Sequence, residues 1–303
     1  MTYKVTQEEM KYRMNLSFVD KIDLSCERIE NWYSHWEGKV YIAFSGGKDS
    51  TVLLDIVRNR ALIPDSKLIP AVFIDTGLEY PEIRDFVKSV DNVTWIKPKI
   101  NFREVIKQYG YPVISKEQSS FIDQFRNTGS DKLRDIRLNG NAWGYGKISK
   151  KWFFLTEAPF KISDKCCDKL KKEPSRRYEK ETNKRPMLGI RIEESQLRKN
   201  IYRKYGCNIY DSRRPQSNPL SFWNQKDIDE YIEKYNVPYS KIYDMGYDRT
   251  GCMFCVFGVH KECNPNKFQK MQITHPKMYD YCINNLGLGE VMDYIGVNYK
   301  NED

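Results

Sequence analysis

One 18-residue stretch, VYIAFSGGKDSTVLLDIV at positions 40–57, restricts what this chain can fold into more than any other feature. An apolar run typical of a buried strand ends at Ser45, and an apolar pattern with helical spacing begins directly after Ser50. The adjacent glycines Gly46 and Gly47 let backbone amides approach a ligand without a Cβ in the way. A helix that begins at the carboxyl end of a strand offers unpaired N–H groups to an anion. The stretch therefore predicts a phosphate site.

The loop between the predicted strand and helix is neither of the two common phosphate-binding loops. A Walker loop needs four residues between its first glycine and Gly-Lys-[Ser/Thr], whereas the glycines are adjacent here, and GxGxxG does not match either. The hydroxyls of Ser45 and Ser50 and the charge of Lys48 suit a phosphate. The alternative, a tight strand-to-helix turn with a capping serine, is disfavoured by this composition.

Short apolar runs alternate with helical patterns along the first third of the chain, which predicts an α/β fold. Such alternation is typical of βαβ units, and we expect a mostly parallel twisted sheet with helices on both faces. The runs are KVYIAF, DSTVLLDIVRN, LIPAVFI, PEIRDFVKSV and VTWIK. We predict an N-terminal helical segment (1–37), an α/β core (38–220) with a basic insertion around 115–184, and a C-terminal segment with helices (221–303).

Composition narrows the class of protein. No run approaches the roughly 18 apolar residues of a membrane helix, and the N-terminal residues lack a secretory signal, so we expect a cytoplasmic protein without membrane contact. Residues 147–214 hold 20 Lys and Arg against 9 Asp and Glu, within a net charge of +9. A segment with this excess of positive charge can bind nucleic acid or a polyphosphate ligand. A solvated, lysine-rich surface that binds neither is an equally good interpretation. Aromatic residues lie in and next to this basic segment, a pattern that is typical of nucleic-acid binding and equally of a packed lobe. They are Trp143, Tyr145, Trp152, Phe153 and Phe154.

Three further motifs follow the loop in order: VFIDTGLEYPE (72–82), GIRIEESQLR (189–198) and NPLSFWNQKDIDEYIEKYNVPYSKIYDMGYDRTGCMFC (218–255). Together with SGGKDS they resemble the phosphoadenylyl/adenylyl sulfate reductase family of the adenine nucleotide α-hydrolase superfamily. The resemblance covers about residues 38–255. It implies a Rossmann-like fold and chemistry at the α-phosphate of ATP or of an adenylylated sulfate.

The resemblance also implies which residues bind the nucleotide. Asp75, Thr76 and Gly77 are expected at ribose and adenine, and Arg191 and Arg198 at phosphate or sulfate oxygens through forked hydrogen bonds. Glu194 and Ser195 would orient these arginines, although Arg198 could instead be an ordinary i,i+4 partner of Glu194. The whole expected nucleotide set is Ser45, Gly46, Gly47, Lys48, Asp49, Ser50, Asp75, Thr76, Gly77, Gly189, Arg191, Glu194, Ser195 and Arg198. Catalysis is expected of Lys48, Asp49 and Arg191, with Mg²⁺ on the nucleotide.

Two tight cysteine pairs, Cys166-Cys167 and Cys252-x-x-Cys255, stand out among eight cysteines. In a cytosolic chain such cysteines are more often metal ligands or catalytic thiols than disulfides. Adjacent cysteines chelate zinc poorly because neighbouring side chains diverge. Similar pairs occur in iron–sulfur adenylyl sulfate reductases, so the resemblance implies a [4Fe–4S] cluster, ahead of zinc or plain thiols. Cys26 and Cys207 lie on apolar-patterned segments and are expected in the core.

The sequence departs from the reductases in one respect. Those enzymes carry a nucleophilic cysteine in an E-C-G-L-H motif that is absent here; Cys263 and Cys282 are the candidate substitutes, each more typical of a structural thiol. The chain is also similar to the sulfur-transfer component of DNA phosphorothioation, which combines this loop with four cluster cysteines. We therefore expect ATP activation to AMP and pyrophosphate, coupled to sulfur transfer onto nucleic acid. A sulfur donor protein and an oligomeric state are compatible with this function. The alternatives are a thioredoxin-dependent sulfonucleotide reductase and a non-catalytic nucleotide- or redox-sensing module.

Overall fold

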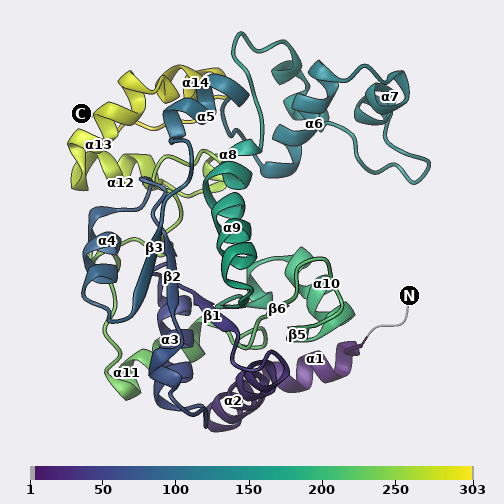
Figure 1. Cartoon of the computed structure of the whole chain (residues 1–303). Coiled ribbons are helices and arrows are strands. Elements are labelled where there is room, and N and C mark those ends of the chain that lie inside the picture. Colours follow the sequence, from purple (N-terminus) through teal and green to yellow (C-terminus); the bar gives the residue numbers. More distant parts are fainter. Residues whose placement is uncertain (1–3, 302–303) are drawn as a thin grey trace. The chain divides into compact units, whose positions relative to one another are not determined.

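Residues 4–301 are described by the structure, a computed structural model, and they divide into two compact units (Figure 1). The first unit consists of residues 4–75, 80–96 and 175–250, and the second of residues 76–79, 97–174 and 251–301. No helix among these described residues is both long and apolar enough to cross a membrane.

The first unit is built on a six-stranded sheet with the strand order β3-β2-β1-β4-β6-β5. All neighbouring strands are parallel except β5 and β6, which are antiparallel. The strands are β1 (Val40–Ala43), β2 (Ala71–Ile74), β3 (Val93–Ile96), β4 (Arg185–Leu188), β5 (Asn208–Ile209) and β6 (Gln216–Ser217). The α/β prediction with a mostly parallel sheet is confirmed.

Helices cover both faces of this sheet. Tyr41 and Val72 on one face pack with Tyr178 of α9, whereas α3 packs against α2 and α11. The helices of this unit are α1 (Gln7–Met14), α2 (Phe18–His35), α3 (Lys48–Asn59), α4 (Pro81–Lys88), most of α9 (Glu173–Thr182), α10 (Gln196–Tyr205) and α11 (Gln225–Tyr235). Short 3₁₀ turns are η1 (Ser66–Leu68), η4 (Ile192–Glu194) and η5 (Lys241–Tyr243).

Helix α2 lies in the predicted N-terminal helical segment and is amphipathic. The Ser17 hydroxyl accepts a hydrogen bond from the Asp20 N–H and caps its first turn. Ile22, Ile29 and Trp32 form a buried stripe at helical spacing. This helix is part of the first unit, so the predicted separate segment 1–37 does not correspond to a compact unit.

Helix α11 also belongs to the first unit, so the predicted boundary at residue 220 falls inside a compact unit. The reason is packing: Ile228 and Tyr231 on its inner side are 0% exposed. Asp227, in the first turn of α11, also forms a buried ion pair with Lys21 of α2, whose Nζ lies 2.7 Å from Asp227 Oδ2.

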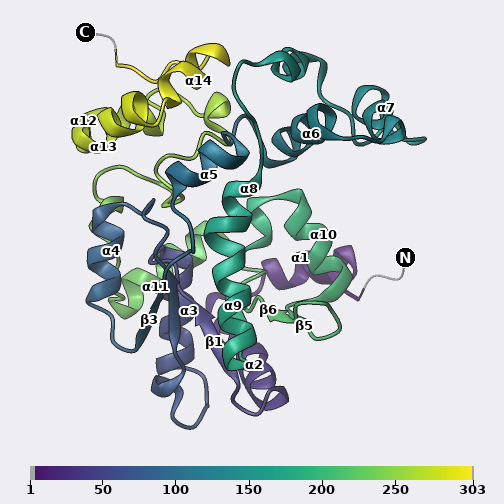
Figure 2. The same ribbon diagram turned by 45° about the horizontal axis from the view of Figure 1, so that its top comes forward.

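The second unit is helical in its described residues (Figure 2). The sequence predicts a basic insertion at residues 115–184, and the structure has the helices α6 and α7 in its first part. The hydroxyls of Ser115 and Ser130 cap the first turns of these two helices. The elements are α5 (Phe102–Tyr109), α6 (Lys116–Asn127), α7 (Asp131–Asn139), 3₁₀ helix η2 (Lys150–Glu157), α8 (Lys165–Cys167), π-helical η3 (Asp168–Lys172) and 3₁₀ turn η6 (Val259–Lys261). The helices expected in the C-terminal segment are present as α12 (Lys267–Thr274), α13 (Pro276–Asp280) and π-helical η7 (Tyr281–Asn285), followed by α14 (Leu288–Tyr294).

Candidate nucleotide loop and cysteine pocket

The SGGKDS loop joins β1 to α3, as the sequence predicts. Gly46 has a φ of +73°, and a Cβ there would lie 2.9 Å from methyl carbons of both Ile83 and Val87. Both residues belong to α4, which packs directly against the loop. Only glycine satisfies the backbone conformation and the close approach together.

The two serines of the loop bond to the loop itself. Ser50 Oγ donates to the Gly47 carbonyl oxygen at 2.8 Å, and the Ser45 N–H donates to Ser50 Oγ at 3.2 Å. The Gly47 N–H donates to Ser45 Oγ at 3.3 Å. The hydroxyls predicted to contact phosphate therefore hold the loop in its turn, which preorganises its amides.

A tyrosine from η5 contacts the first residue of α3. The Lys48 N–H donates to the Tyr243 hydroxyl oxygen at 2.9 Å, and that oxygen lies 3.2 Å from Thr250 Oγ1. Burial raises the pKa of Tyr243, which keeps the phenol neutral at ordinary pH. Tyr243 and Thr250 lie within the 218–255 motif, but no spacing within that motif singles them out. The contact between Tyr243 and Lys48 joins residues 195 positions apart.

The side chain of Lys48 points to a second group of residues from the same motif. Its Nζ lies 2.9 Å from Asp229 Oδ1 and 5.2 and 5.1 Å from the ring centres of Tyr239 and Tyr243. Asp229 Oδ2 in turn accepts from Gln225 Nε2 at 3.1 Å. Lys48 is thus held by a carboxylate and two aromatic faces.

Arg191 connects the end of β4 to the loop. Its Nε lies 3.0 Å from Asp49 Oδ2, its Nη1 2.8 Å from Glu193 Oε2, and its Nη2 2.8 Å from Gln225 Oε1. Burial raises the pKa of Asp49 despite the charge of Arg191. The predicted catalytic residues Lys48, Asp49 and Arg191 therefore lie in one network within the first unit.

Gly189 lies where this network meets the loop backbone. A Cβ at Gly189 would be 2.7 Å from the carbonyl oxygen of Asp49 and 3.0 Å from the nitrogen of Ser50. The glycine therefore permits direct contact between the segment after β4 and the first turn of α3.

Arg198, Glu194 and Ser195 interact mainly with one another. Arg198 forms an ion pair with Glu194, and Ser195 Oγ accepts from the Arg198 N–H at 3.3 Å, capping α10. Glu194 Oε1 also accepts from the Arg191 N–H at 3.4 Å. The i,i+4 pairing considered for Arg198 is present, and its role at phosphate stays a prediction.

The predicted ribose and adenine contacts are distributed over both units. Asp75, at the end of β2 in the first unit, is 5% exposed, and its Oδ2 accepts from Arg84 Nη2 at 3.0 Å. Thr76 belongs to the second unit, where its N–H and Oγ1 donate to the Glu79 carboxylate at 2.9 and 2.8 Å. Gly77 follows in the second unit with a φ of +76°.

Both cysteine pairs lie in the second unit and line one pocket there. The pocket has a volume of about 20 Å³. It is lined by Leu78, Phe102, Pro112, Cys166, Cys167, Leu170, Lys171, Cys252 and Cys255. Cys166 and Cys167 are carried by α8, just before the π-helical turn η3, while Cys252 and Cys255 lie in the turn that follows residue 250.

Electrostatics in this pocket favour the thiolate form of one cysteine, Cys167, and the thiol form of two others. A hydrogen bond from Cys166, and then the charges of lysines including Lys171, lower the pKa of Cys167 to about 6. The same hydrogen bond and burial raise the pKa of Cys166, and burial raises that of Cys252. The charge of Cys252 raises the pKa of Lys171, so the ammonium stays protonated beside the sulfur atoms.

The donor set fits a thiolate-bound cluster: four cysteines, apolar walls from Leu78 and Phe102, and a partly buried cation at Lys171. Within residues 4–301, no three His, Cys, Asp or Glu side chains are gathered as they would be around a single metal ion. The [4Fe–4S] cluster therefore stays a prediction.

The remaining cysteines have different environments. Cys282 is 0% exposed and burial raises its pKa, whereas Cys263 is exposed. Cys207 is buried, as expected of a core residue, and Cys26 is only partly buried.

With this geometry established, comparisons with known proteins identify the family. The phosphoadenosine phosphosulfate reductase domain matches residues 39–127 and 116–257, so the chain belongs to this family, whose characterised members are enzymes. The expected family relationship is therefore confirmed.

Relatives carry different names. The uncharacterized protein MJ0066 of Methanocaldococcus jannaschii is 29% identical over 262 residues, which cover 83% of this chain and 42% of that protein. An adenosine 5′-phosphosulfate reductase of Bacillus cereus is 24% identical over 261 residues, covering 86% of this chain and 89% of the relative. The crystal structure of phosphoadenylyl-sulfate reductase from Candida auris aligns with a TM-score of 0.44 at 20% identity, covering 83% and 98% of the two chains. The chain spans about half the length of the archaeal relatives that it matches.

Proposed function

We propose that this protein activates an acceptor with ATP at the α-phosphate and transfers sulfur to it, with nucleic acid as the acceptor. The observation that carries this proposal is the common pocket of Cys166, Cys167, Cys252 and Cys255 in a chain whose family binds adenylylated sulfur compounds. Nucleotide binding alone would not need four thiols around one pocket. A [4Fe–4S] cluster held by these four thiolates would supply iron–sulfur chemistry for handling sulfur.

The chain's own residues would act at the nucleotide. The Gly46 amide would bind a phosphate oxygen, and the Gly47 and Lys48 amides would join it by exchanging Ser45 Oγ and the Tyr243 hydroxyl for phosphate oxygens. Lys48 Nζ would leave Asp229 to balance charge on the departing pyrophosphate. Arg191 would position Asp49 and the loop through its three hydrogen bonds rather than bind phosphate itself. Mg²⁺ is expected to accompany the triphosphate.

The proposed reaction has two balanced steps. An acceptor hydroxyl attacks the α-phosphorus, the bond from that phosphorus to the pyrophosphate oxygen breaks, and one proton is released. Hydrosulfide then attacks the acceptor atom that bears the adenylylated oxygen. That atom gains a bond to sulfur and loses its bond to oxygen, and AMP leaves with the electron pair. Neither step changes an oxidation state when the donor is at the level of sulfide.

The test is an anaerobic incubation with ATP labelled at the α-phosphate, hydrosulfide and single-stranded nucleic acid. We expect AMP and pyrophosphate, and at least tenfold less of both with Lys48→Met because a charge at the leaving group is lost. Lys67→Met, an exposed lysine of the same unit, is the matched control and should keep full activity. Nucleotide binding without turnover would contradict the proposal and favour a sensing module.

A thiol-dependent reductase of adenylyl sulfate is the second candidate function. It is favoured because the match with the adenosine 5′-phosphosulfate reductase of Bacillus cereus covers most of both chains. Such an enzyme needs an accessible nucleophile. Cys282 is 0% exposed, whereas Cys263 is exposed. Release of sulfite from adenylyl sulfate with thioredoxin, abolished in Cys263→Ser, would therefore establish this function and overturn the first.

A further inference from the structure

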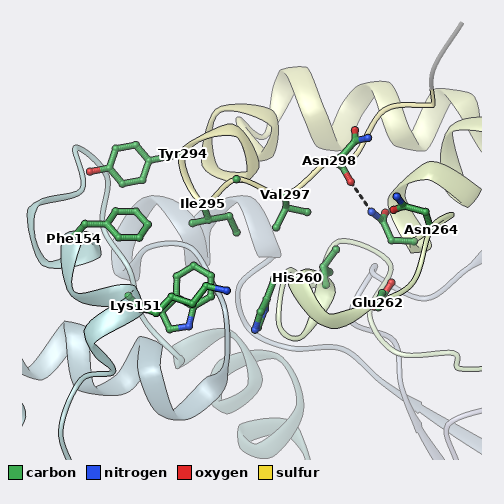
Figure 3. A pocket seen from close by; sticks show the side chains of 13 residues that line it. Lys151, Phe154, His260, Glu262, Asn264, Tyr294, Ile295, Val297 and Asn298 are labelled. Carbon is green, nitrogen blue, oxygen red and sulfur yellow. Dashed lines mark hydrogen bonds between the residues drawn. The ribbon is translucent and has the colours of Figure 1, made fainter.

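A second pocket lies in the second unit, and its residues belong to neither the loop nor the cysteine pocket (Figure 3). It has a volume of about 500 Å³, and η2, η6, the segment after η6 and the segment after α14 form it. It is lined by Lys151, Trp152, Phe154, Val259, His260, Glu262, Asn264, Asn266, Tyr294, Ile295, Gly296, Val297 and Asn298.

One end of this pocket is aromatic. The rings of Phe154 and Tyr294 lie 5.6 Å apart, centre to centre, and both side chains are substantially exposed, at 43% and 38%. Figure 3 shows these two rings together at one end, near Lys151. Trp152 forms the floor beside them, with its ring centre 6.2 Å from that of Phe154 and 5.2 Å from that of His260. Exposed, mutually supported rings of this kind offer a flat partner to a heterocycle.

The other end is polar and presents donors and acceptors. Figure 3 places Asn264 and Asn298 there, away from the two rings. Asn266 Nδ2 donates to the Asn298 carbonyl oxygen at 2.5 Å, which fixes this wall. Glu262 accepts from the Lys267 N–H at 2.9 Å and adds a carboxylate. Amides and a carboxylate suit the amino and hydroxyl groups of a nucleoside, and the charge of the carboxylate repels a phosphate.

Positive charge lies at the aromatic end instead. Lys151 Nζ lies 4.8 Å from the centre of the Trp152 ring, and Lys151 is exposed. Burial lowers the pKa of His260, so this imidazole is neutral and Lys151 supplies the charge. Residues 97–174 of this unit carry 17 Lys and Arg against 9 Asp and Glu. Such a surface attracts a polyanion.

We propose that this pocket binds one unstacked nucleotide of a single-stranded nucleic acid. The base stacks on Phe154 and Tyr294, its polar edge or sugar faces the asparagines, and its phosphate lies toward Lys151. Single-strand binding proteins combine stacking aromatic side chains with a basic surface in this way. Exposed Trp143 and Tyr145 of the same unit extend the set of aromatic side chains beyond the pocket. Binding of the strand does not depend on the proposed function. The role of that strand as the sulfur acceptor does rest on it.

The test uses the full chain without ATP and a fluorescein-labelled 15-nucleotide oligodeoxythymidylate or oligouridylate, followed by fluorescence anisotropy. We expect Phe154→Ala and Tyr294→Ala each to weaken binding by between about fivefold and a hundredfold, the range for losing one base-stacking partner. Phe153→Ala is the matched control, because Phe153 is a neighbouring exposed ring (38%) that does not line the pocket. All these side chains are partly exposed, so the variants should fold, which circular dichroism verifies.

Salt dependence separates charge from stacking. Lys151→Gln should lower the slope of log K against log salt by about 0.7, the value for one phosphate on a single strand. Phe154→Ala should leave the slope unchanged, and so should Lys150→Gln, an adjacent exposed lysine outside the pocket. Thymidine monophosphate in excess should compete with the oligonucleotide in the unmodified protein.

Three results would overturn the inference. The first is that Phe154→Ala and Tyr294→Ala bind the oligonucleotide with unchanged affinity. The second is that Phe153→Ala loses as much affinity as these two variants. The third is that the protein binds a duplex as tightly as it binds the single strand. Lys48→Met keeps this test distinct from that of the proposed function, because it should lose pyrophosphate release and still bind the oligonucleotide normally. Failure of strand binding alone would refute the pocket and leave ATP activation untouched.

Discussion

At the scale of single residues, the contact between Gly189 and the first turn of α3 controls the geometry of the nucleotide loop. A Cβ at Gly189 would lie 2.7 Å from the Asp49 carbonyl oxygen, which is backbone and cannot rotate away. We expect Gly189→Ala to lower the free energy of unfolding by about 1–3 kcal/mol through overpacking, and to weaken ATP binding with it. Denaturant titration and calorimetry measure the two effects.

Gly129→Ala is the control for this substitution, because nothing lies within 4 Å of a Cβ at Gly129 and its φ is not in the left-handed region. It should leave both stability and ATP binding unchanged. An unfolding free energy for Gly189→Ala equal to that of Gly129→Ala would show that the loop and the segment after β4 move apart freely.

Thiol reactivity should distinguish the cysteines outside the pocket. Burial raises the pKa of Cys26 and of Cys207 to about 11, and it raises that of Cys282. At pH 8 the fraction of thiolate at these sites is therefore small, and it grows only as the pH rises toward the raised values. Cys263 is exposed, so we expect iodoacetamide to alkylate it first, as read by peptide mass spectrometry.

The denatured chain is the control for that experiment, because all eight cysteines should react in urea. Alkylation of Cys282 at the rate of Cys263 in the folded protein would contradict the burial described here. It would also restore Cys282 as a candidate nucleophile.

At the scale of elements, the buried ion pair between α2 and α11 ties the N-terminal helix to the motif that contacts the loop. Lys21 and Asp227 are 2% and 8% exposed, and the Asp227 carboxylate also accepts from the Asn224 N–H at 2.7 Å. Lys21→Met leaves a buried carboxylate without its cation. We expect it to lower the free energy of unfolding by about 3–5 kcal/mol.

Lys39→Met is the matched control, since it removes an exposed ion pair with Glu37 in the same unit. Its effect should be at most about 1 kcal/mol. If the two substitutions cost the same in a urea titration, the pair between α2 and α11 does not stabilise the fold.

The elements that could be predicted from sequence are those with strong local signals. The apolar run of β1, the buried stripe of α2 and Pro81 at the start of α4 each indicate the element directly. Helix α7 has no such signal, because none of its residues is buried. Strands β5 and β6 have two residues each and exist only through tertiary pairing.

The same distinction applies to the candidate nucleotide site. The loop itself was predictable because strand, glycines and helix follow one another in sequence. Its partners Tyr243 and Asp229 were not, because their contacts with Lys48 join residues 195 and 181 positions apart. No periodicity or spacing within one chain specifies which residues of a long motif will meet a loop so distant in sequence.

At the scale of the whole molecule, the cysteine pocket joins segments of the second unit that are far apart in sequence. Cys166 and Cys167 lie on α8. Cys252 and Cys255 follow in the sequence only after residues 175–250, which belong to the first unit. A cluster bound by all four would add its binding free energy to the stability of this unit. Removing it should therefore loosen the second unit selectively.

Hydrogen exchange tests this with the anaerobically reconstituted protein and the same protein after chelation. We expect peptides covering 163–174 and 251–257 to exchange faster after chelation, while peptides covering β1 to β4 keep their protection. Iron analysis should give about four irons per chain before chelation. Cys255→Ser should lose iron and behave like the chelated form, whereas Cys26→Ser, a cysteine outside the pocket, should retain both iron and protection. Equal exchange in the reconstituted and chelated forms would mean that the four thiols do not hold the second unit together through a cluster.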